Sequence, residues 1–281
     1  MDETITTYQP DNSLRRGLPT VLKDILTELA DSRWLISQLI RRDLVATYKQ
    51  SLFGVLWAFI IPFAGVATIL LLGSSGVLTI GELAAPYPIY AILGLAFWQL
   101  FATGLVASSN ALVNAGPMLV KINFSKKSLV LAAVAQAIVP FLMQLILLLI
   151  LSIWYGYVPE LTLLLLPVLV IPIGLLTLGL GFMLSLLNGV LRDTGNAVAI
   201  LLTFLLFATP VLYAKPAAGI LARVSIVNPL YYLVAVPRDI ILSGGFAGLR
   251  GFLVASVFAA LTLSLCVVLF HLTETRVTER I

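Results

Sequence analysis

The residues that could do chemistry are few in this sequence and stand apart from one another. His271 is the only histidine and Cys266 the only cysteine among 281 residues. A histidine metal cluster, a histidine-dependent catalytic triad and an internal disulfide are therefore excluded. We predict no catalytic residue, no metal site and no cofactor in this chain, and we interpret Cys266, which lies in an apolar run, as a packing residue.

A phosphate-binding loop for ATP is also missing from the sequence. Lys127-Ser128 comes closest to the GxxxxGK[ST] motif, but the glycines that should precede it are absent. The chain therefore does not hydrolyse ATP by that route.

The 13 acidic residues avoid the middle of every long apolar run. Ion-coupled transporters usually carry an ionisable group at mid-membrane, where the ion binds and is released. Membrane enzymes need acids, histidines or nucleophiles gathered at one depth. Neither pattern is present, which favours a channel, a structural subunit or a pore driven by a separate motor.

The composition of the chain indicates what kind of fold holds these residues. Hydrophobic residues make up 60% of the chain and charged residues only 11%, whereas soluble domains are roughly half apolar and a quarter charged. A soluble fold could not hide so much apolar surface, so the solvent for most of the chain must be lipid. The net charge of +4 then relates to orientation in the membrane rather than to nucleic acid.

Six charge-free stretches approach the roughly 20 apolar residues that a helical span needs. They run from about 52 to 72, 88 to 113, 129 to 155, 161 to 187, 197 to 213 and 251 to 270. The apolar residues are continuous rather than alternating, so the spans are helices and not strands. The sequence predicts an all-α integral membrane protein with six transmembrane helices.

Basic residues predict the orientation. With the N-terminus inside, the outer connections contain Lys215, Arg223, Arg238 and Arg250, which leaves 13 of the 17 Lys and Arg residues on the inner side. This bias follows the positive-inside rule. Six spans also return the chain to its starting side, so both termini are predicted to be cytoplasmic.

The N-terminal region, residues 1–50, is predicted to form a cytoplasmic unit distinct from the transmembrane domain, residues 51–281. Its first 20 residues have no apolar core of signal-peptide length. Residues 18–50 mix charged and apolar residues with helical spacing, and Trp34 suits a membrane surface. We interpret this stretch as an amphipathic interface helix; the alternative is a soluble helix packed on a partner.

The outer connection, residues 214–250, contains apolar pieces that are too short to span and are interrupted by Pro and charge. Short re-entrant or interfacial helices before the last span fit this pattern. On the inner side, residues 114–128 combine Gly-Pro with a short apolar and basic stretch. This suggests a small cytoplasmic helix that lies either against a partner protein or on the lipid surface.

Several motifs resemble those of the ABC-2 type permeases that export polysaccharides. Arg42-Asp43-Leu44, Tyr48-Lys49-Gln50-Ser51, Gly54, Trp57 and Pro62 resemble the family's opening pattern. Further resemblances are Lys121 to Ala133, Arg192-Asp193 with Pro210-Val211-Leu212-Tyr213, and Asn228-Pro229-Leu230. They occur in the family's order, although Ser125 follows Phe124 where the family usually has proline.

The resemblance implies a permease subunit of the bacterial inner membrane. Such permeases are homodimers that pair with two cytoplasmic ATP-binding-cassette subunits, which hold ATP and magnesium, and they export lipid-linked glycans. O-antigen is the first expectation. A capsule or teichoic acid exporter of the same family and an integral membrane enzyme of glycan assembly are the alternatives.

The resemblance also implies roles for particular residues. Coupling to the ATPase is expected at Gly116, Pro117, Met118, Leu119 and Lys121. The interface helix and lipid headgroup site would contain Arg41, Arg42, Tyr48 and Lys49, although positive-inside orientation explains these basic residues equally well. The outer gate would include Asn228, Pro229, Tyr231 and Tyr232.

Aromatic residues in and near the first two spans are candidates for a sugar channel. They are Trp57, Phe59, Phe63, Tyr90, Phe97, Trp98 and Phe101, with Tyr87 at the outer end of the second span. Aromatic faces would stack on pyranose rings. The alternative is an ordinary aromatic belt at the membrane interface.

Overall fold

The structure is a computed structural model that describes residues 18–49, 54–74, 83, 85–116, 124–214 and 218–278. Every regular element in these ranges is a helix, which confirms the all-α prediction. The elements are α1 (Leu18–Asp31), α2 (Arg33–Lys49), η3 (Gly54–Leu56), α3 (Trp57–Ser74), α4 (Tyr87–Ser109), α5 (Ala111–Asn114), α7 (Lys126–Ala135), α8 (Ile138–Trp154), η4 (Leu161–Leu165), α9 (Leu166–Val190), α10 (Thr194–Ala208), α11 (Ile220–Val227), α12 (Pro229–Ser243) and α13 (Leu249–Thr278).

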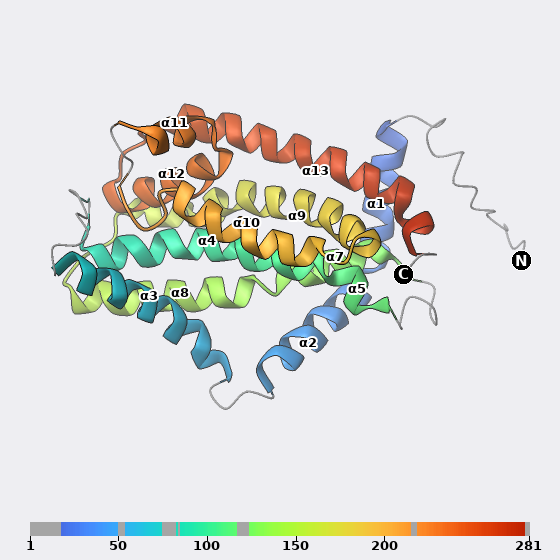
Figure 1. Cartoon of the computed structure of the whole chain (residues 1–281), viewed down its shortest axis with the longest axis horizontal. Helices are drawn as coiled ribbons and strands as arrows, with labels where there is room; N and C mark the ends of the chain where they lie inside the picture. The colour runs from blue at the N-terminus through green and yellow to red at the C-terminus, as the bar shows by residue number, and fades with distance from the viewer. Residues whose placement is uncertain are drawn as a thin grey trace, which may run out of the picture.

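Helices α4, α8, α9, α10 and α13 run along the long axis of the molecule (Figure 1). Helices α11 and α12 lie at one end of this bundle, and α1 lies at the other end beside the last turns of α13. Helix α2 leads away from the bundle and α3 returns toward it, so the two form an open V.

Four continuous helical segments are long and apolar enough to cross a membrane. They are Tyr87–Ser109, Lys126–Trp154, Leu161–Val190 and Leu249–Glu274. The bent pair α11 and α12 would make a fifth crossing if the two helices together form one span. The chain is therefore a multi-pass membrane protein.

The prediction of six complete spans is not confirmed, because two predicted spans form shorter apolar helices. Helix α10 has 15 residues, about 22 Å at 1.5 Å per residue, whereas the hydrocarbon core of a bilayer is about 30 Å thick. In α3, the continuous apolar segment is Phe59–Thr68, which is also shorter than a full span. Each predicted span nevertheless coincides with a helix in the structure.

The predicted N-terminal helix is two helices rather than one. Ser32 separates α1 from α2. Val21 and Ile25 of α1 are buried in a cluster with Leu112 of α5 and Phe270 of α13, so this part of the chain packs on one end of the bundle. Its position at a membrane surface and the domain boundary at residue 50 stay predictions, and Gln50 lies outside the described residues.

Helix α4 is the centre of the bundle. Ile89, Leu93 and Phe97 have no exposed surface, and the neighbouring side chains of α4 belong to the same core cluster. Small residues allow close helix contacts around this core. A Cβ atom added to Gly179 of α9 would lie 2.8 Å from the backbone of Leu263, so α9 and α13 meet almost backbone to backbone.

Candidate functional site

The aromatic residues of α4 lie inside the protomer. Tyr90, Phe97, Trp98 and Phe101 are all buried. The ring of Phe97 packs edge-on against Phe141 of α8, at a centroid distance of 6.1 Å. These are the contacts of core residues, so the protomer supports packing for these four side chains, and their role in lining a channel stays a prediction.

The aromatic residues of α3 have a different environment. Trp57 and Phe63 are exposed, and Phe59 is partly buried against the core. Trp57 lines a cavity of about 220 Å³ between α3, α4 and α8. Of the predicted channel aromatics, Trp57 and Phe63 are those that present accessible rings.

The predicted outer gate is a sharp helical elbow. Helices α11 and α12 meet at an angle of 92°, with Asn228 between them. The Asn228 side chain accepts a hydrogen bond from the backbone N–H of Leu230 and donates to Thr209 Oγ1 at 2.9 Å. Pro229 takes the first helical position, where a missing N–H costs nothing. Asn-Pro therefore ends one helix, starts the next and attaches the elbow to the end of α10.

Tyr231 and Tyr232 follow the elbow and their rings contact edge to face. Tyr232 donates its hydroxyl to the carbonyl oxygen of Ile226, on the other side of the bend. Its ring packs so closely on α13 that a Cβ atom at Gly251 would lie 2.2 Å from ring atom Cε1. Tyr232 thus stabilises the bend between α11 and α12 and packs it against α13.

Arg238 of α12 is buried in the core, with 1% of its surface exposed. One terminal nitrogen, Nη1, donates to the carbonyl oxygens of Pro210 and Val211, at 2.9 and 2.8 Å. The guanidinium carbon lies 3.7 Å from the ring centroid of Tyr90, a cation–π contact. Asp239 Oδ1 accepts from Nε at 2.9 Å and supplies the counter-charge. Arg238 therefore fixes the segment after α10 to α4.

The other end of α12 is held by the connection between α8 and η4. Tyr157 donates its hydroxyl to the carbonyl oxygen of Leu242 at 2.6 Å, and Thr162 donates to that of Ile240 at 2.9 Å. Burial, followed by the nearby Glu160 carboxylate, raises the pKa of Tyr157, so this phenol keeps the proton that it donates. Helix α12 is therefore held at both of its ends and at Arg238.

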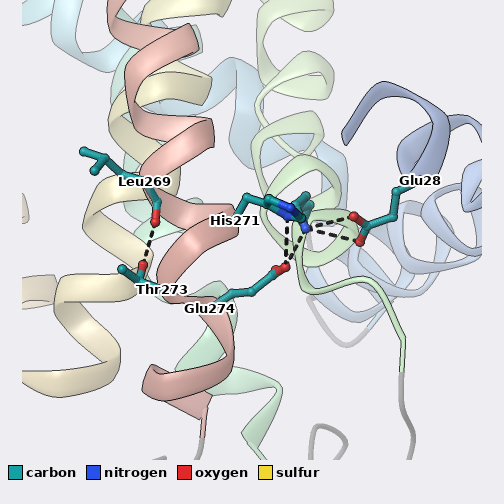
Figure 2. Close-up of polar contacts among 6 residues, drawn as sticks. Glu28, Leu269, His271, Thr273 and Glu274 are labelled. Carbon is teal, nitrogen blue, oxygen red and sulfur yellow. Dashed lines mark hydrogen bonds and ion pairs between the residues drawn. The ribbon is translucent and has the colours of Figure 1, made fainter. Parts of the chain in front are cut away.

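A buried ion cluster lies at the opposite end of the molecule. Lys127 of α7 is fully buried, and its Nζ lies 2.9 Å from Glu28 Oε2 and 2.6 Å from Glu274 Oε1. Figure 2 shows Glu28 reaching in from α1 while His271 and Glu274 approach from α13. His271 Nδ1 lies 3.6 Å from the same Glu274 oxygen. The cluster connects α1, the start of α7 and α13.

The basic residues of α2 form a more open site. Arg42 pairs with Asp43 at 2.8 Å, and Gln136, the residue after α7, donates to the other carboxylate oxygen at 3.3 Å. These three residues and Asn114 line a cavity of about 190 Å³. Arg41 and Lys49 are exposed, and the side chain of Tyr48 is outside the described part of the structure. A headgroup site stays a prediction, with Arg42 the residue placed at a cavity.

Comparisons with known proteins place this chain in a family. Residues 35–242 match the family described as ABC-2 type transporter. The chain belongs to this family. It is also 31% identical, over 189 residues, to the O-antigen export system permease protein RfbA of Myxococcus xanthus, which covers 67% of this chain and 72% of the relative. An O-antigen export system permease protein RfbA of Klebsiella pneumoniae is 24% identical over 212 residues, 75% of this chain and 81% of the relative.

In this ABC-2 type chain, the segment predicted to contact an ATPase is only partly described. Gly116 follows α5, while Pro117, Met118, Leu119 and Lys121 lie outside the described residues. The two sides of the segment are well defined: Leu112 of α5 packs in the same cluster as Val21 of α1 and Phe270 of α13, and α7 begins one residue before the buried Lys127. Coupling at this segment stays a prediction.

Sequence reasoning missed three buried polar residues of this ABC-2 type chain: Lys127, Arg238 and Asn188. The Asn188 amide of α9 donates to Ser109 O and Asn110 Oδ1, both at 3.0 Å, and accepts from Gly195 N–H at 3.0 Å. This junction joins α4, α9 and the start of α10. A polar residue inside an apolar run was the available signal for Asn188, because such a group in lipid needs a partner. Lys127 and Arg238 had been interpreted as orientation charges.

Within the described residues, no group of three His, Cys, Asp or Glu residues is placed to hold a metal ion. The described residues instead form the Lys127 ion cluster at one end of the bundle, the Arg238 contacts at the other end and a cavity between α3, α4 and α8. Its chemistry consists of hydrogen bonding, ion pairing and apolar contact.

Proposed function

We propose that this chain is the membrane permease subunit of an ABC transporter that exports a lipid-linked polysaccharide, with O-antigen as the first candidate. The observation that carries the proposal is the likeness, over two thirds or more of this chain, to relatives named O-antigen export permeases. The family match over residues 35–242 supports it. A capsule or teichoic acid exporter of the same family is the alternative substrate assignment.

We further propose that the working unit contains two copies of the chain. Helices α3 and α10 are short and expose large apolar side chains on the outside of the protomer, among them Phe63, Phe204 and Phe207. Between them lies the Gln99–Thr103 face of α4, which borders two cavities. A second copy packed on these faces would enclose a passage and complete the two short spans.

Energy in this proposal comes from two ATP-binding-cassette subunits on the cytoplasmic side. The sequence has no GxxxxGK[ST] motif of its own. The loop that contains Gly116 to Lys121 would rest on the ATPase, and the Lys127 cluster would pass its movement to α1 and α13. All six helical regions then cross the inner membrane, with both termini in the cytoplasm and the elbow at the outer face.

Two measurements test the proposal. The chain purified alone is expected to show no ATPase activity, and its complex with the ATP-binding-cassette subunit is expected to hydrolyse ATP and to retain a lipid diphosphate glycan detectable by mass spectrometry. ATPase activity of the lone chain would contradict the separate-motor assignment.

Expression of both subunits in a strain without its own O-antigen permease is expected to restore the polysaccharide at the cell surface. Polysaccharide that remains inside, in cells with normal amounts of both subunits, would contradict O-antigen as the substrate. Restoration in a capsule or teichoic acid export mutant would then identify the alternative.

A further inference from the structure

Gln144 is a buried amide without a hydrogen-bond partner. It lies on α8, within the Lys126–Trp154 span, and exposes 1% of its surface. Neither its Nε2 nor its Oε1 atom has a partner among the residues that the structure describes. An unsatisfied buried polar group costs about 1–3 kcal/mol, and in hydrocarbon no water compensates it. Such a group in a membrane span suggests a ligand.

A cavity of about 220 Å³ adjoins this amide. Gln99 and Thr103 of α4 line it together with Gln144, while Trp57, Ile61 and Pro62 of α3 form an apolar wall. Thr103 donates its hydroxyl to Gln99 Oε1 at 3.1 Å, and the Gln99 side chain adds an NH₂ donor to the residues that line the cavity. The site therefore combines amide groups with an aromatic surface.

Gln99 and Thr103 also line a second cavity, of about 410 Å³, on the side of α4 that faces α10. Gln99 lies near the middle of α4, so the polar strip stands inside the apolar layer. Among the described residues, none that lines either cavity is charged. The strip can thus recognise a neutral, hydroxyl-bearing ligand and offers no attraction to a phosphate.

We propose that Gln99, Thr103 and Gln144 form a hydrogen-bonding ledge for the neutral sugar residues of the exported chain, which passes along α4 while its anionic lipid diphosphate stays elsewhere. The inference rests on the proposed function and assigns its substrate contacts. Sugar hydroxyls would supply the partners that Gln144 lacks, and the apolar face of a sugar ring would lie on Trp57.

The first test is photo-cross-linking in the complete complex of permease and ATP-binding-cassette subunit, supplied with lipid-linked glycan. p-Benzoylphenylalanine is introduced at Thr103, and at Ser264 of α13 as the control, since Ser264 is exposed and lines neither cavity. The position 103 variant is expected to give at least about tenfold more permease–glycan adduct. Equal yields at both positions would overturn the ledge.

The second test removes the hydrogen-bonding groups. Gln99→Leu/Thr103→Val is expected to lower glycan export about tenfold with unchanged ATPase activity and complex yield, whereas the control Thr262→Val/Ser264→Ala keeps export within about twofold. Gln144→Leu is expected to raise Tm and to lower export, because a purely structural amide would lose stability when removed. Export unchanged in the ledge variants, or a lower Tm for Gln144→Leu, would overturn the inference.

These tests separate the ledge from the proposed function. Wild-type complex that exports glycan, with ledge variants that export equally well, contradicts the ledge alone. Wild-type complex that never moves glycan contradicts the proposed function, and the ledge with it.

Discussion

The Nζ atom of Lys127 lies 2.6 Å from Oε1 of Glu274, although the two residues are 147 positions apart in the sequence. The contact joins the first turn of α7 to the end of α13, and Glu28 extends it to α1 (Figure 2). Both partners of the pair are nearly free of solvent contact, so each charge depends on the other. This end of the bundle is therefore held by electrostatics as well as by apolar packing.

Replacing this lysine should be strongly destabilising. Lys127→Met removes the lysine cation from buried Glu274 and leaves only His271, 3.6 Å away, beside that carboxylate. Breaking one side of a buried ion pair costs about 3–5 kcal/mol. Thermal unfolding of the purified protein in detergent is expected to show a lower Tm and a smaller folded fraction. A Tm equal to that of the wild type would show that the cluster contributes nothing to stability.

The double variant Lys127→Met/Glu274→Met provides the matched control. Removing both charges leaves no buried ion without a partner, because the remaining Glu28 carboxylate is 34% exposed to solvent. Apolar replacements of buried pairs are often neutral or stabilising. The double variant is expected to recover most of the lost stability. No recovery would mean that the lysine acts through its packing rather than through its charge.

Arg238 should hold the segment after α10 in place. In Arg238→Met, the carbonyl oxygens of Pro210 and Val211 lose their donor, at about 1–3 kcal/mol for each buried acceptor. Amide hydrogen exchange in residues 209–214 is expected to become faster by at least tenfold. Arg250→Met is the control, since Arg250 is exposed at the start of α13. Similar exchange in both variants would refute the role of Arg238.

Gly179 should tolerate no side chain. A Cβ atom there would lie 2.8 Å from the Leu263 backbone, which cannot move aside as a flexible side chain could. Gly179→Ala is expected to cost about 1–3 kcal/mol by overpacking, measured as a lower Tm. Gly174→Ala on the same helix is the control, since nothing lies within 4 Å of its Cβ position. Equal Tm values for the two variants would argue against a close crossing of α9 and α13.

Asn188 should stabilise the start of α10. Asn188→Leu removes three hydrogen bonds and leaves the carbonyl oxygen of Ser109 and the N–H of Gly195 without this partner. A loss of about 2–3 kcal/mol is expected, at roughly 1 kcal/mol per bond, together with faster hydrogen exchange in the first turn of α10. Asn188→Asp keeps the acceptor for Gly195, so retained protection of that amide would distinguish the two halves of the junction.

The helices were predictable because the cause of each is local. A long apolar stretch must satisfy its own backbone in lipid, and only a helix does so within one segment. The sequence therefore predicted a helix at each expected span, and it predicted short helices in residues 214–250, where the structure has α11 and α12. Pro237, which was expected to interrupt these pieces, lies inside α12. Lengths were less predictable. Residues 197–213 looked like a full span, yet α10 ends at Ala208 and Arg238 binds the carbonyl oxygens that follow.

The candidate site was predictable only in outline. The sequence suggested Phe97 and Phe101 as channel aromatics; both rings are buried in the protomer because α4 is its central helix, and their role in a channel stays a prediction. Which face of an all-apolar helix points inward has no sequence signal, because both faces are equally hydrophobic. The polar residues Gln99 and Thr103 interrupt the same apolar run, and this was an available signal that the prediction did not use.

The sequence by itself determined that this chain is a membrane protein, that its spans are helical and that it has no GxxxxGK[ST] loop for ATP. These three properties depend only on the types of residues along short segments of the chain. Only the tertiary structure decided which polar groups meet. Glu28 and Glu274 lie 99 and 147 positions from Lys127, and no local pattern encodes such a contact. Buried charges and amides such as Lys127 and Asn188 find their partners through the packing of whole helices, and that packing creates the ion cluster and the bend between α11 and α12.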